Sequence, residues 1–476
     1  MVGVPRSSGC RLCVKRRVKC DERAPGCAKC ETYGQPCPGY DKGFKFIAGK
    51  PYRTRRRPLG INNARPNASP SSSSSSPTIG ESRPETQVLV QREIPPTLVS
   101  VDVNVLQSIG ALIEDFSSPR VLKAPNYVMS SWFELLPSIY GESRALDATI
   151  KSFAAHHFGR GFQNQEMIIY ARSAYGEALH WLRKALMNPS ESLSSNIFCA
   201  VVLLCMYELF TDTEDPESWM KHAKGLGQLV KARGPERYCN QLDISLLKSA
   251  RGLIVMHSMF AGEDCFLASD EWHHMMRQQH LATLPLDYHN CIEDFFAYFT
   301  HSPRIVHNLY SLREKNHSDP EILQEISQAL TQVLDMQSKM TSWYEKWSRI
   351  SSPPVEIPST TGDPLYPNIL TYADLLDASI YCGYYAYMII IHEALRAFGY
   401  PGRQETIVSY FRDQICKSIE YTAFGVLGPY RIGFPVRVAI ETADDVTRSW
   451  LLSRLQEFSK IYAAAKPENY KPIANA

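Results

Sequence analysis

The chain has 476 residues, enough for two to four domains, and its 51 basic and 49 acidic residues leave a formal charge of only +2. That balance hides an asymmetry. Residues 1–57 hold 15 Lys and Arg against four Asp and Glu, a charge of +11, so the remainder carries −9. A basic head on an acidic body is typical of a protein that binds a polyanion. The best apolar run, Ala378 to Ile391, has about 14 residues and is too short for a membrane span of roughly 20.

After a short tail of residues 1–9, six cysteines repeat the unit C-x2-C-x6-C twice, at Cys10, Cys13, Cys20, Cys27, Cys30 and Cys37. In each unit the C-x2-C pair can grip one metal ion and the third cysteine can close the cage. Six thiolates fill two tetrahedral sites only if two of them bridge both ions. The pseudo-symmetry of the repeat suggests the first cysteine of each half, Cys10 and Cys27, as the bridges.

Two other interpretations of these cysteines compete. A disulfide scaffold needs an oxidising compartment, and residues 1–9 contain no apolar stretch of the kind that a secretory signal has. A four-ligand zinc ribbon of the two C-x2-C pairs would leave Cys20 and Cys37 without a role at matching offsets. The duplicated spacing therefore favours a site with two metal ions.

The charge between the cysteines is not duplicated. The first half holds five basic residues, whereas the second half holds only Lys29 and the acid Glu31. A short helix from about Cys13 would place basic side chains at its exposed end, where they can reach phosphates or pair with guanine. The alternative to a polyanion-binding role is that these basic residues form only a solvent-exposed surface. The basic residues of the first half are Arg11, Lys15, Arg16, Arg17 and Lys19.

The stretches Gly9–Asp21 and Pro25–Cys30 resemble the fungal zinc binuclear cluster, or Zn(2)-Cys(6), family of transcription factors. The resemblance implies a nuclear protein that binds double-stranded DNA, with two zinc ions held by all six cysteines. It also implies that Arg16 and Arg17 contact the bases of a CGG-type triplet and that Lys19 holds a phosphate. Pro25 takes the usual loop position. Val14 departs from the pattern, since this position is often basic, and one possible phosphate contact is lost.

Residues 38–97 are expected to form a basic and then Ser/Pro-rich disordered linker. Its basic run, Lys50–Pro58, suits backbone phosphates or an import receptor, and the low-complexity tract Pro66–Pro77 cannot bury apolar surface. No sustained heptad repeat follows the cluster, so monomer and dimer both stay open. Together with Lys15 and Lys19, the linker residues expected to neutralise phosphates are Arg53, Arg55, Arg56 and Arg57.

Residues 98–476 are expected to form an all-α domain, because apolar residues recur at helical spacing and strand alternation is scarce. A clear case begins at Asp215-Pro216, continues through Trp219 to Val230 and stops at Gly234-Pro235. Similar stripes run through Glu166–Met187, Ile197–Leu209, Ile244–Phe260, Glu321–Trp347, Ala373–Ala397 and Val446–Ile461. Seven scattered cysteines, Cys199, Cys205, Cys239, Cys265, Cys291, Cys382 and Cys416, are predicted to be reduced and mostly buried.

The segments Trp219–Pro235 and Pro435–Ala439 are similar to the fungus-specific regulatory domain that often accompanies this cluster. That resemblance implies a region that senses a small-molecule effector or holds co-regulators and the transcription machinery.

No enzyme motif is apparent in the body. The pairs His156-His157, His273-His274 and His392-Glu393 do not form H-E-x-x-H, and Gly225-Leu-Gly227 lacks the third glycine of a dinucleotide loop. These histidines are therefore predicted to be surface or core residues. The tyrosines of the stripe Tyr381, Tyr384, Tyr385 and Tyr387 are expected in the core rather than around a ligand.

The sequence as a whole predicts a zinc-dependent, sequence-specific regulator of RNA polymerase II genes and not an enzyme. The role of this protein as a pathway-specific activator of a secondary-metabolite gene cluster is suggested only by the common role of members of the family that it resembles. The alternative is a zinc-stabilised interaction module or co-regulator. Its basic face would bind DNA without sequence preference or dock acidic partners.

Overall fold

The computed structural model describes residues 10–21, 23, 26–37, 103–117, 132–211, 218–279, 284–313, 315 and 318–470. The chain divides into two compact units, Met1–Gln91 and Arg92–Ala476. The described part of the first unit contains two short helices, α1 (Arg11–Lys15) and α2 (Ala28–Thr32). The whole predicted linker, 38–97, lies outside the described residues. Its four arginines, Arg53, Arg55, Arg56 and Arg57, lie outside with it.

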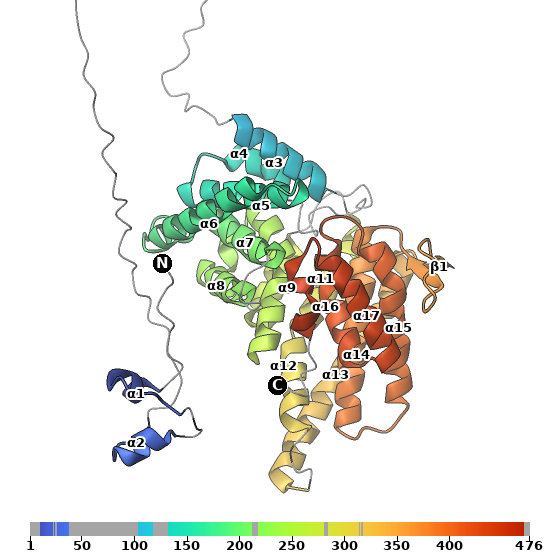
Figure 1. Ribbon diagram of the computed structural model, residues 1–476. Coiled ribbons are helices and arrows are strands. Elements are labelled where there is room, and N and C mark those ends of the chain that lie inside the picture. Colours follow the sequence, from blue (N-terminus) through green and yellow to red (C-terminus); the bar gives the residue numbers. More distant parts are fainter. Residues whose placement is uncertain are drawn as a thin grey trace, which may run out of the picture. The chain divides into compact units, whose positions relative to one another are not determined.

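The second unit, which we call the body, is mostly helical, as the sequence predicts (Figure 1). Its first helices are α3 (Val103–Phe116), α4 (Leu136–Ile139), α5 (Arg144–Gly161), α6 (Gln165–Leu186), α7 (Ser195–Phe210), α8 (Ser218–Arg233) and α9 (Gln241–Ala261). They are followed by α10 (Asp270–Gln278), α11 (Leu286–Phe299), α12 (Ser302–Leu312), α13 (Pro320–Ile350), α14 (Leu375–Ala397), α15 (Gln404–Thr422), α16 (Gly428–Glu441) and α17 (Asp445–Phe458). Short 3-10 turns are η2 (Phe133–Leu135), η3 (Pro235–Arg237), η4 (Phe266–Ala268), η5 (Ala463–Ala465) and η6 (Pro467–Tyr470).

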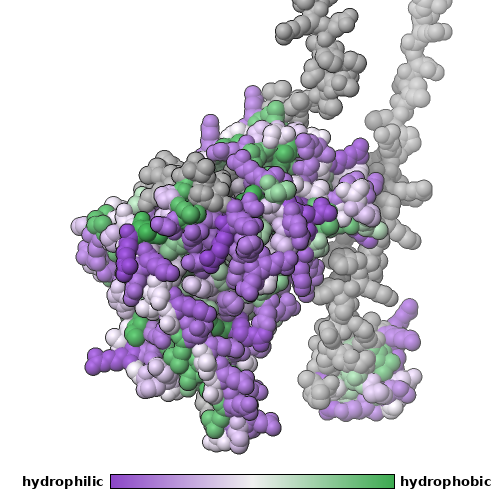
Figure 2. All heavy atoms as spheres, turned by 180° about the vertical axis from the view of Figure 1, so that it is seen from behind, coloured by the Kyte–Doolittle hydropathy of each residue, from purple (hydrophilic) through white to green (hydrophobic). Residues whose placement is uncertain are grey.

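Two helices of the body are buried on nearly every side. In α7 each residue from Ile197 to Phe210 is buried, and α14 contains the apolar run Ala378 to Ile391. A helix that is apolar all round either lies in a protein core or spans a membrane. Among the described helices, none combines the length and the apolar character that a bilayer span requires. Other helices pack around these two, and the visible face in Figure 2 is mainly hydrophilic with scattered apolar side chains.

The helices predicted from apolar spacing correspond to helices of the structure. All six apolar stripes overlap an observed helix, although the last helix, α17, ends at Phe458 and not at Ile461. The helix predicted after Asp215 is α8, and Gly234 stops it with a φ of 70°, a conformation open to glycine. The expected cap at Asp215-Pro216 lies outside the described residues.

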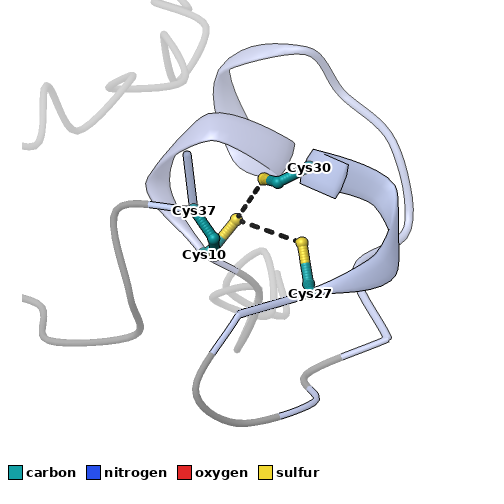
Figure 3. Close-up of side chains that lie close together, drawn as sticks. All are labelled: Cys10, Cys27, Cys30 and Cys37. Carbon is teal, nitrogen blue, oxygen red and sulfur yellow. Dashed lines mark hydrogen bonds between the residues drawn. The ribbon is translucent and has the colours of Figure 1, made fainter. Parts of the chain in front are cut away.

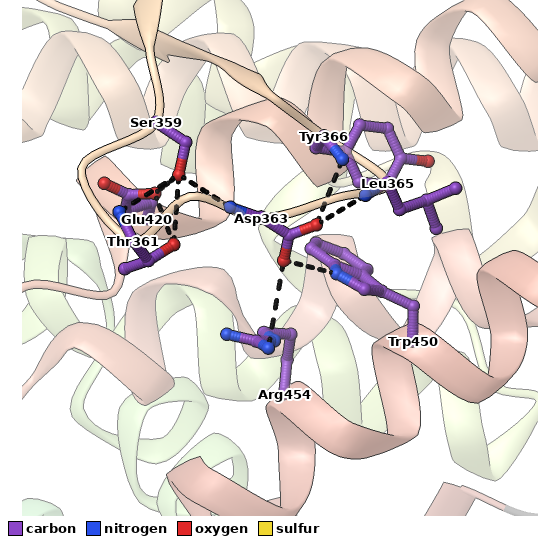
Figure 4. Close-up of polar contacts among 8 residues, drawn as sticks. All are labelled: Ser359, Thr361, Asp363, Leu365, Tyr366, Glu420, Trp450 and Arg454. Atoms are coloured by element: carbon purple, nitrogen blue, oxygen red, sulfur yellow. Dashed lines mark hydrogen bonds and ion pairs between the residues drawn. The ribbon is translucent and has the colours of Figure 1, made fainter.

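A small antiparallel hairpin lies between the helices of the body. The prediction of an all-α domain did not include this hairpin. Strand β1 (Val355–Pro358) pairs with β2 (Asn368–Thr371), and their loop is tied down by two carboxylates (Figure 4). Glu420 on α15 accepts hydrogen bonds from Ser359 and from the two threonines that follow it. Asp363 accepts from the Trp450 indole at 2.7 Å and lies 3.8 Å from Arg454, both on α17. The hairpin is therefore stabilised by contacts distant in sequence.

The tyrosine stripe of α14 is core, which confirms the prediction. All four of its tyrosines are buried, and two of them, Tyr381 and Tyr384, pack against aromatic residues of α13. The rings of Tyr384 and Tyr344 stack at 4.7 Å between centroids. The indole of Trp343 donates to the carbonyl of Cys291 at 2.7 Å and so links α13 to α11. The prediction for the seven body cysteines also holds, since all are free thiols and all but Cys239 are buried.

Candidate metal centre and nucleic-acid interface

The sulfur atoms of the six N-terminal cysteines form two overlapping groups of four. One group contains Cys10, Cys27, Cys30 and Cys37, and the other contains Cys10, Cys13, Cys20 and Cys27. Within each group every sulfur lies within 4.8 Å of the others. Both groups contain the same two cysteines, Cys10 and Cys27, which are the residues that the repeat suggests as bridges. Figure 3 shows the first group, with the sulfur of Cys10 directed toward those of Cys27 and Cys30.

The spacing of these sulfurs fits zinc. Two sulfurs bound to one tetrahedral zinc ion at about 2.3 Å are separated by about 3.8 Å, the edge of the tetrahedron. The Sγ atom of Cys10 lies 3.8 Å from the Sγ atom of Cys27 and 3.5 Å from that of Cys30. Those of Cys13 and Cys27 are 3.6 Å apart. The donor set is all sulfur, which a structural zinc site favours, so the residues present fit two zinc ions.

Three thiols of this centre, those of Cys13, Cys27 and Cys30, are poor anions unless a cation is bound. Burial and neighbouring thiols raise the pKa of Cys13 to about 12, and burial also raises the pKa values of Cys27 and Cys30. A bound zinc ion makes the thiolate the stable form and releases the protons. Of the six cysteines, Cys20 and Cys37 are half-buried and the other four are buried.

The first helix begins earlier than predicted, at Arg11 and not at about Cys13. The cause is local, since the Cys10 sulfur accepts a hydrogen bond from the Cys13 N–H at 3.4 Å and so caps the helix start. Helix α1 ends at Lys15, and the Val18 N–H donates to the Cys13 carbonyl at 3.1 Å. This bond closes a Schellman turn.

The turn after α1 places three of the predicted DNA-contacting residues, Arg16, Arg17 and Lys19, beyond the helix. Arg17 occupies the turn position that usually favours glycine, with a φ of 56°. Its side chain is exposed, as are those of Lys15 and Lys19. Arg16 differs from these three, because it is half-buried against the second half of the cluster. The structure thus brings four basic residues to one short segment beside the metal centre.

The second half of the cluster is held by contacts that the sequence analysis missed. The carboxylate of Asp21 accepts a hydrogen bond from the Ala28 N–H at 3.1 Å, and this bond lowers the pKa of Asp21. Arg23 forms an ion pair with Glu31. A Cβ at Gly26 would lie 3.2 Å from the Cβ of Cys37, which is a tight fit. The signal for this contact in the sequence was an acidic residue, Asp21, seven positions before the start of α2.

In the body, the described residues give no further group of metal-ligating side chains beyond the cysteines. His156 and His392 are buried, and His392 is hydrogen bonded to the amide oxygen of Gln404 at 2.6 Å. His157 lies 2.7 Å from the carboxylate of Asp115. These positions agree with the structural roles that the sequence predicts for the histidine pairs.

The body and the cysteine cluster each match a known protein family. Residues 116–462 match the fungal specific transcription factor domain, which covers most of the chain. The chain belongs to this family. Residues 8–45 match the fungal Zn(2)-Cys(6) binuclear cluster domain, and the cluster of six cysteines is compatible with the two zinc ions that such a domain binds. Both families are families of fungal transcription factors, and their members act in the nucleus.

Relatives of this family member match only in part. A stretch of 126 residues is 25% identical to the uncharacterized protein AN5342 of Emericella nidulans, and it covers 26% of this chain and 27% of that protein. A stretch of 50 residues is 46% identical to white-opaque regulator 2 of Candida albicans, and it covers 10% of each. The chain therefore spans about a quarter of the first relative and a tenth of the second. No solved structure matches.

Proposed function

We propose that this protein is a zinc-dependent transcription factor that reads CGG-type triplets in the major groove of double-stranded DNA. The observation that carries the proposal is the pair of four-sulfur groups that share Cys10 and Cys27, with an exposed basic turn directly attached. Zinc at both groups would fix the start and the middle of α1, because Cys10 caps this helix and Cys13 is its third residue. The turn after α1 would then be rigid when it meets DNA.

Base contacts are assigned to Arg16 and Arg17, and phosphate contacts to Lys15 and Lys19. Arginine can pair with guanine through two parallel hydrogen bonds, and lysine acts on phosphate as a point charge. The arginines of residues 53–57 would add sequence-independent attraction, which weakens as salt rises. In this proposal all six cysteines of residues 10–37 are zinc ligands.

The remaining parts of the chain are assigned by the same proposal. Residues 1–9 form a tail, 38–97 link the two units, and 98–476 regulate activity by holding co-regulators or a small effector. The helical body, which has a net negative charge, has the size and the continuous core of a regulatory domain. Control of a secondary-metabolite gene cluster is the physiological role that we assign to the protein in the fungal nucleus.

The test is selection of random duplex DNA by the full-length protein, with zinc and with a chelator. The proposal expects enrichment of a CGG-type triplet that disappears with the chelator. The number of triplets and their spacing would also report whether the protein binds as a monomer or a dimer. Retention of DNA without enrichment would mean that the basic head is an electrostatic anchor only, and the sequence-reading role would be wrong.

A further inference from the structure

Arg16 makes two contacts with the second half of the cluster. Its guanidinium carbon lies 3.5 Å from the centre of the Tyr33 ring. Its Nη1 donates a hydrogen bond to the main-chain carbonyl of Lys29 at 3.3 Å. These contacts span 17 and 13 positions of sequence, so they exist only because the cluster brings its two halves together.

The Tyr33 ring, against which Arg16 stacks, is itself held beside the metal centre. Tyr33 follows the last residue of α2, and its N–H donates to the carbonyl of Cys30 at 3.1 Å. Gly34, with a φ of 73°, then turns the chain away. Because Cys30 belongs to one of the four-sulfur groups, the position of the ring depends on the same scaffold as the sulfurs. About half of the Tyr33 side chain is exposed, so one side of the pair is open to solvent.

A guanidinium that stacks by its face keeps N–H groups at its edges available for another partner. Arginine has a long side chain, and ordering it on binding costs rotamer entropy. Contacts that hold the side chain before DNA arrives reduce this cost, which is the general advantage of preorganisation. The exposed Arg17 has no comparable contact within the described residues.

We propose that Tyr33 is a positioning residue for DNA reading, which together with the Lys29 carbonyl holds the Arg16 guanidinium ready to contact a base. The less basic half of the cluster thereby takes part in sequence recognition without touching DNA through its own charges. This inference rests on the proposed base-reading role of Arg16. It adds Tyr33 to the residues that determine specificity.

The experiment uses the full-length protein with zinc and two labelled duplexes, the sequence that wins the selection above and a scrambled copy. The Tyr33→Leu substitution keeps apolar bulk but removes the aromatic face, and Tyr33→Phe keeps the face and is the matched control. An exposed cation–π contact of about 0.5–1 kcal/mol corresponds to about a two- to five-fold effect. We expect Tyr33→Leu to weaken binding to the selected duplex by this factor, with little change on the scrambled one. Tyr33→Phe should bind both duplexes as the unsubstituted protein does.

A second comparison shows whether Tyr33 acts through Arg16. In an Arg16→Ala background, Tyr33→Leu should cause no further loss, because the guanidinium that it positions is already gone. A further two- to five-fold loss there would overturn the proposal. So would loss of zinc from Tyr33→Leu, measured as metal bound per chain, or tighter binding by that variant. If the unsubstituted protein does not distinguish the duplexes, the proposed function itself fails. If it does and Tyr33→Leu binds equally well, only the positioning role fails.

Discussion

The Sγ atoms of Cys10 and Cys27 lie 3.8 Å apart, and both atoms belong to both four-sulfur groups. No other pair of cysteines in the cluster has this property. The relationship separates the six cysteines into two shared and four unshared ones. The two kinds should respond differently to substitution.

Replacement of a shared cysteine should empty the whole centre. We expect Cys27→Ser to lose both zinc ions, because it removes one donor from each site at once. The measurement is the number of zinc ions bound per purified chain. Cys20→Ser is the control, since it removes a donor from one group only and should retain more zinc than Cys27→Ser. A Cys27→Ser protein that keeps one full equivalent of zinc would show that Cys27 is not a bridge.

Loss of the Arg17 side chain should reduce specific binding by about 1–3 kcal/mol, the usual contribution of a base-reading arginine. Arg17→Gly is the sharper variant, because glycine suits the φ of 56° and leaves the turn unstrained. Arg17→Ala should behave similarly apart from a small cost in the turn. Binding to the selected and the scrambled duplex is compared by titration. An equal loss on both would assign Arg17 to phosphate contact.

Lys19→Ala should weaken binding about equally on every DNA sequence. If Lys19 neutralises one phosphate, its removal should lower the slope of log affinity against log salt by about 1. The measurement is affinity for the scrambled duplex at several salt concentrations. An unchanged slope would argue against a phosphate contact at this position.

A buried ion network in the body should be important for its stability. The carboxylate of Glu293 lies 3.1 Å from the Lys248 ammonium and 2.6 Å from the Arg251 guanidinium, and all three side chains are nearly inaccessible. Glu293→Gln removes the negative charge that pairs with both buried cations, so the unfolding free energy should fall by about 3–5 kcal/mol. The control is Glu325→Gln, which disrupts an exposed pair with Lys315 and should cost less than about 1 kcal/mol.

Denaturant unfolding followed by tryptophan fluorescence can measure this effect. All seven tryptophans lie at residue 132 or beyond, so the signal reports the body and not the zinc cluster. A Glu293→Gln protein as stable as its control would show that the network contributes nothing to the fold.

The body should lose stability on mild acidification. Burial lowers the pKa of His156 to about 4, and the nearby charge of Arg160 adds to the effect. Between about pH 6.5 and 4, His156 binds a proton in the unfolded chain, where its pKa is near 6.5, but stays neutral in the folded state. The full stability is therefore present above pH 6.5 and falls by up to about 3 kcal/mol over this window.

The same fluorescence assay at pH 7, 6 and 5 tests this dependence. His156→Gln should show a flatter decline, because its side chain does not titrate. His180→Gln is the control, since its ring is exposed to water in the folded protein as well. A decline as steep in His156→Gln as in the unsubstituted protein would contradict the assignment to this histidine.

Local signals in the sequence account for most of what was predicted correctly. The cysteine spacing indicated a shared pair, and the same pair is common to both sulfur groups. Helices with a capping residue were placed to within a few positions, as for α9, where the Asn240 side chain accepts from the Asp243 N–H at 2.9 Å. The start of α1 was missed because its cap is a cysteine sulfur, which ordinary capping preferences do not include.

The features that the sequence did not reveal depend on distant contacts. The β1–β2 hairpin follows two prolines and has little strand pattern of its own, yet Glu420 holds its loop across about 60 positions. The partner of Arg16 was equally hidden, because neither Tyr33 nor the Lys29 carbonyl is a neighbour in the chain. Which basic side chain of the head is ordered could not be inferred from charge alone.

The sequence by itself determined the spacing of the six cysteines that the fold brings together, the basic head on an acidic body, and the position of most helices. Each of these depends on residue type and on spacing over a few positions, where covalent geometry limits the choices. Only the tertiary structure decided that Arg16 rests on Tyr33, that α7 and α14 lie at the centre of the core, and that Glu293 lies between two cations. Such contacts arise when folding closes long loops, and many residues compete for them until packing selects one arrangement.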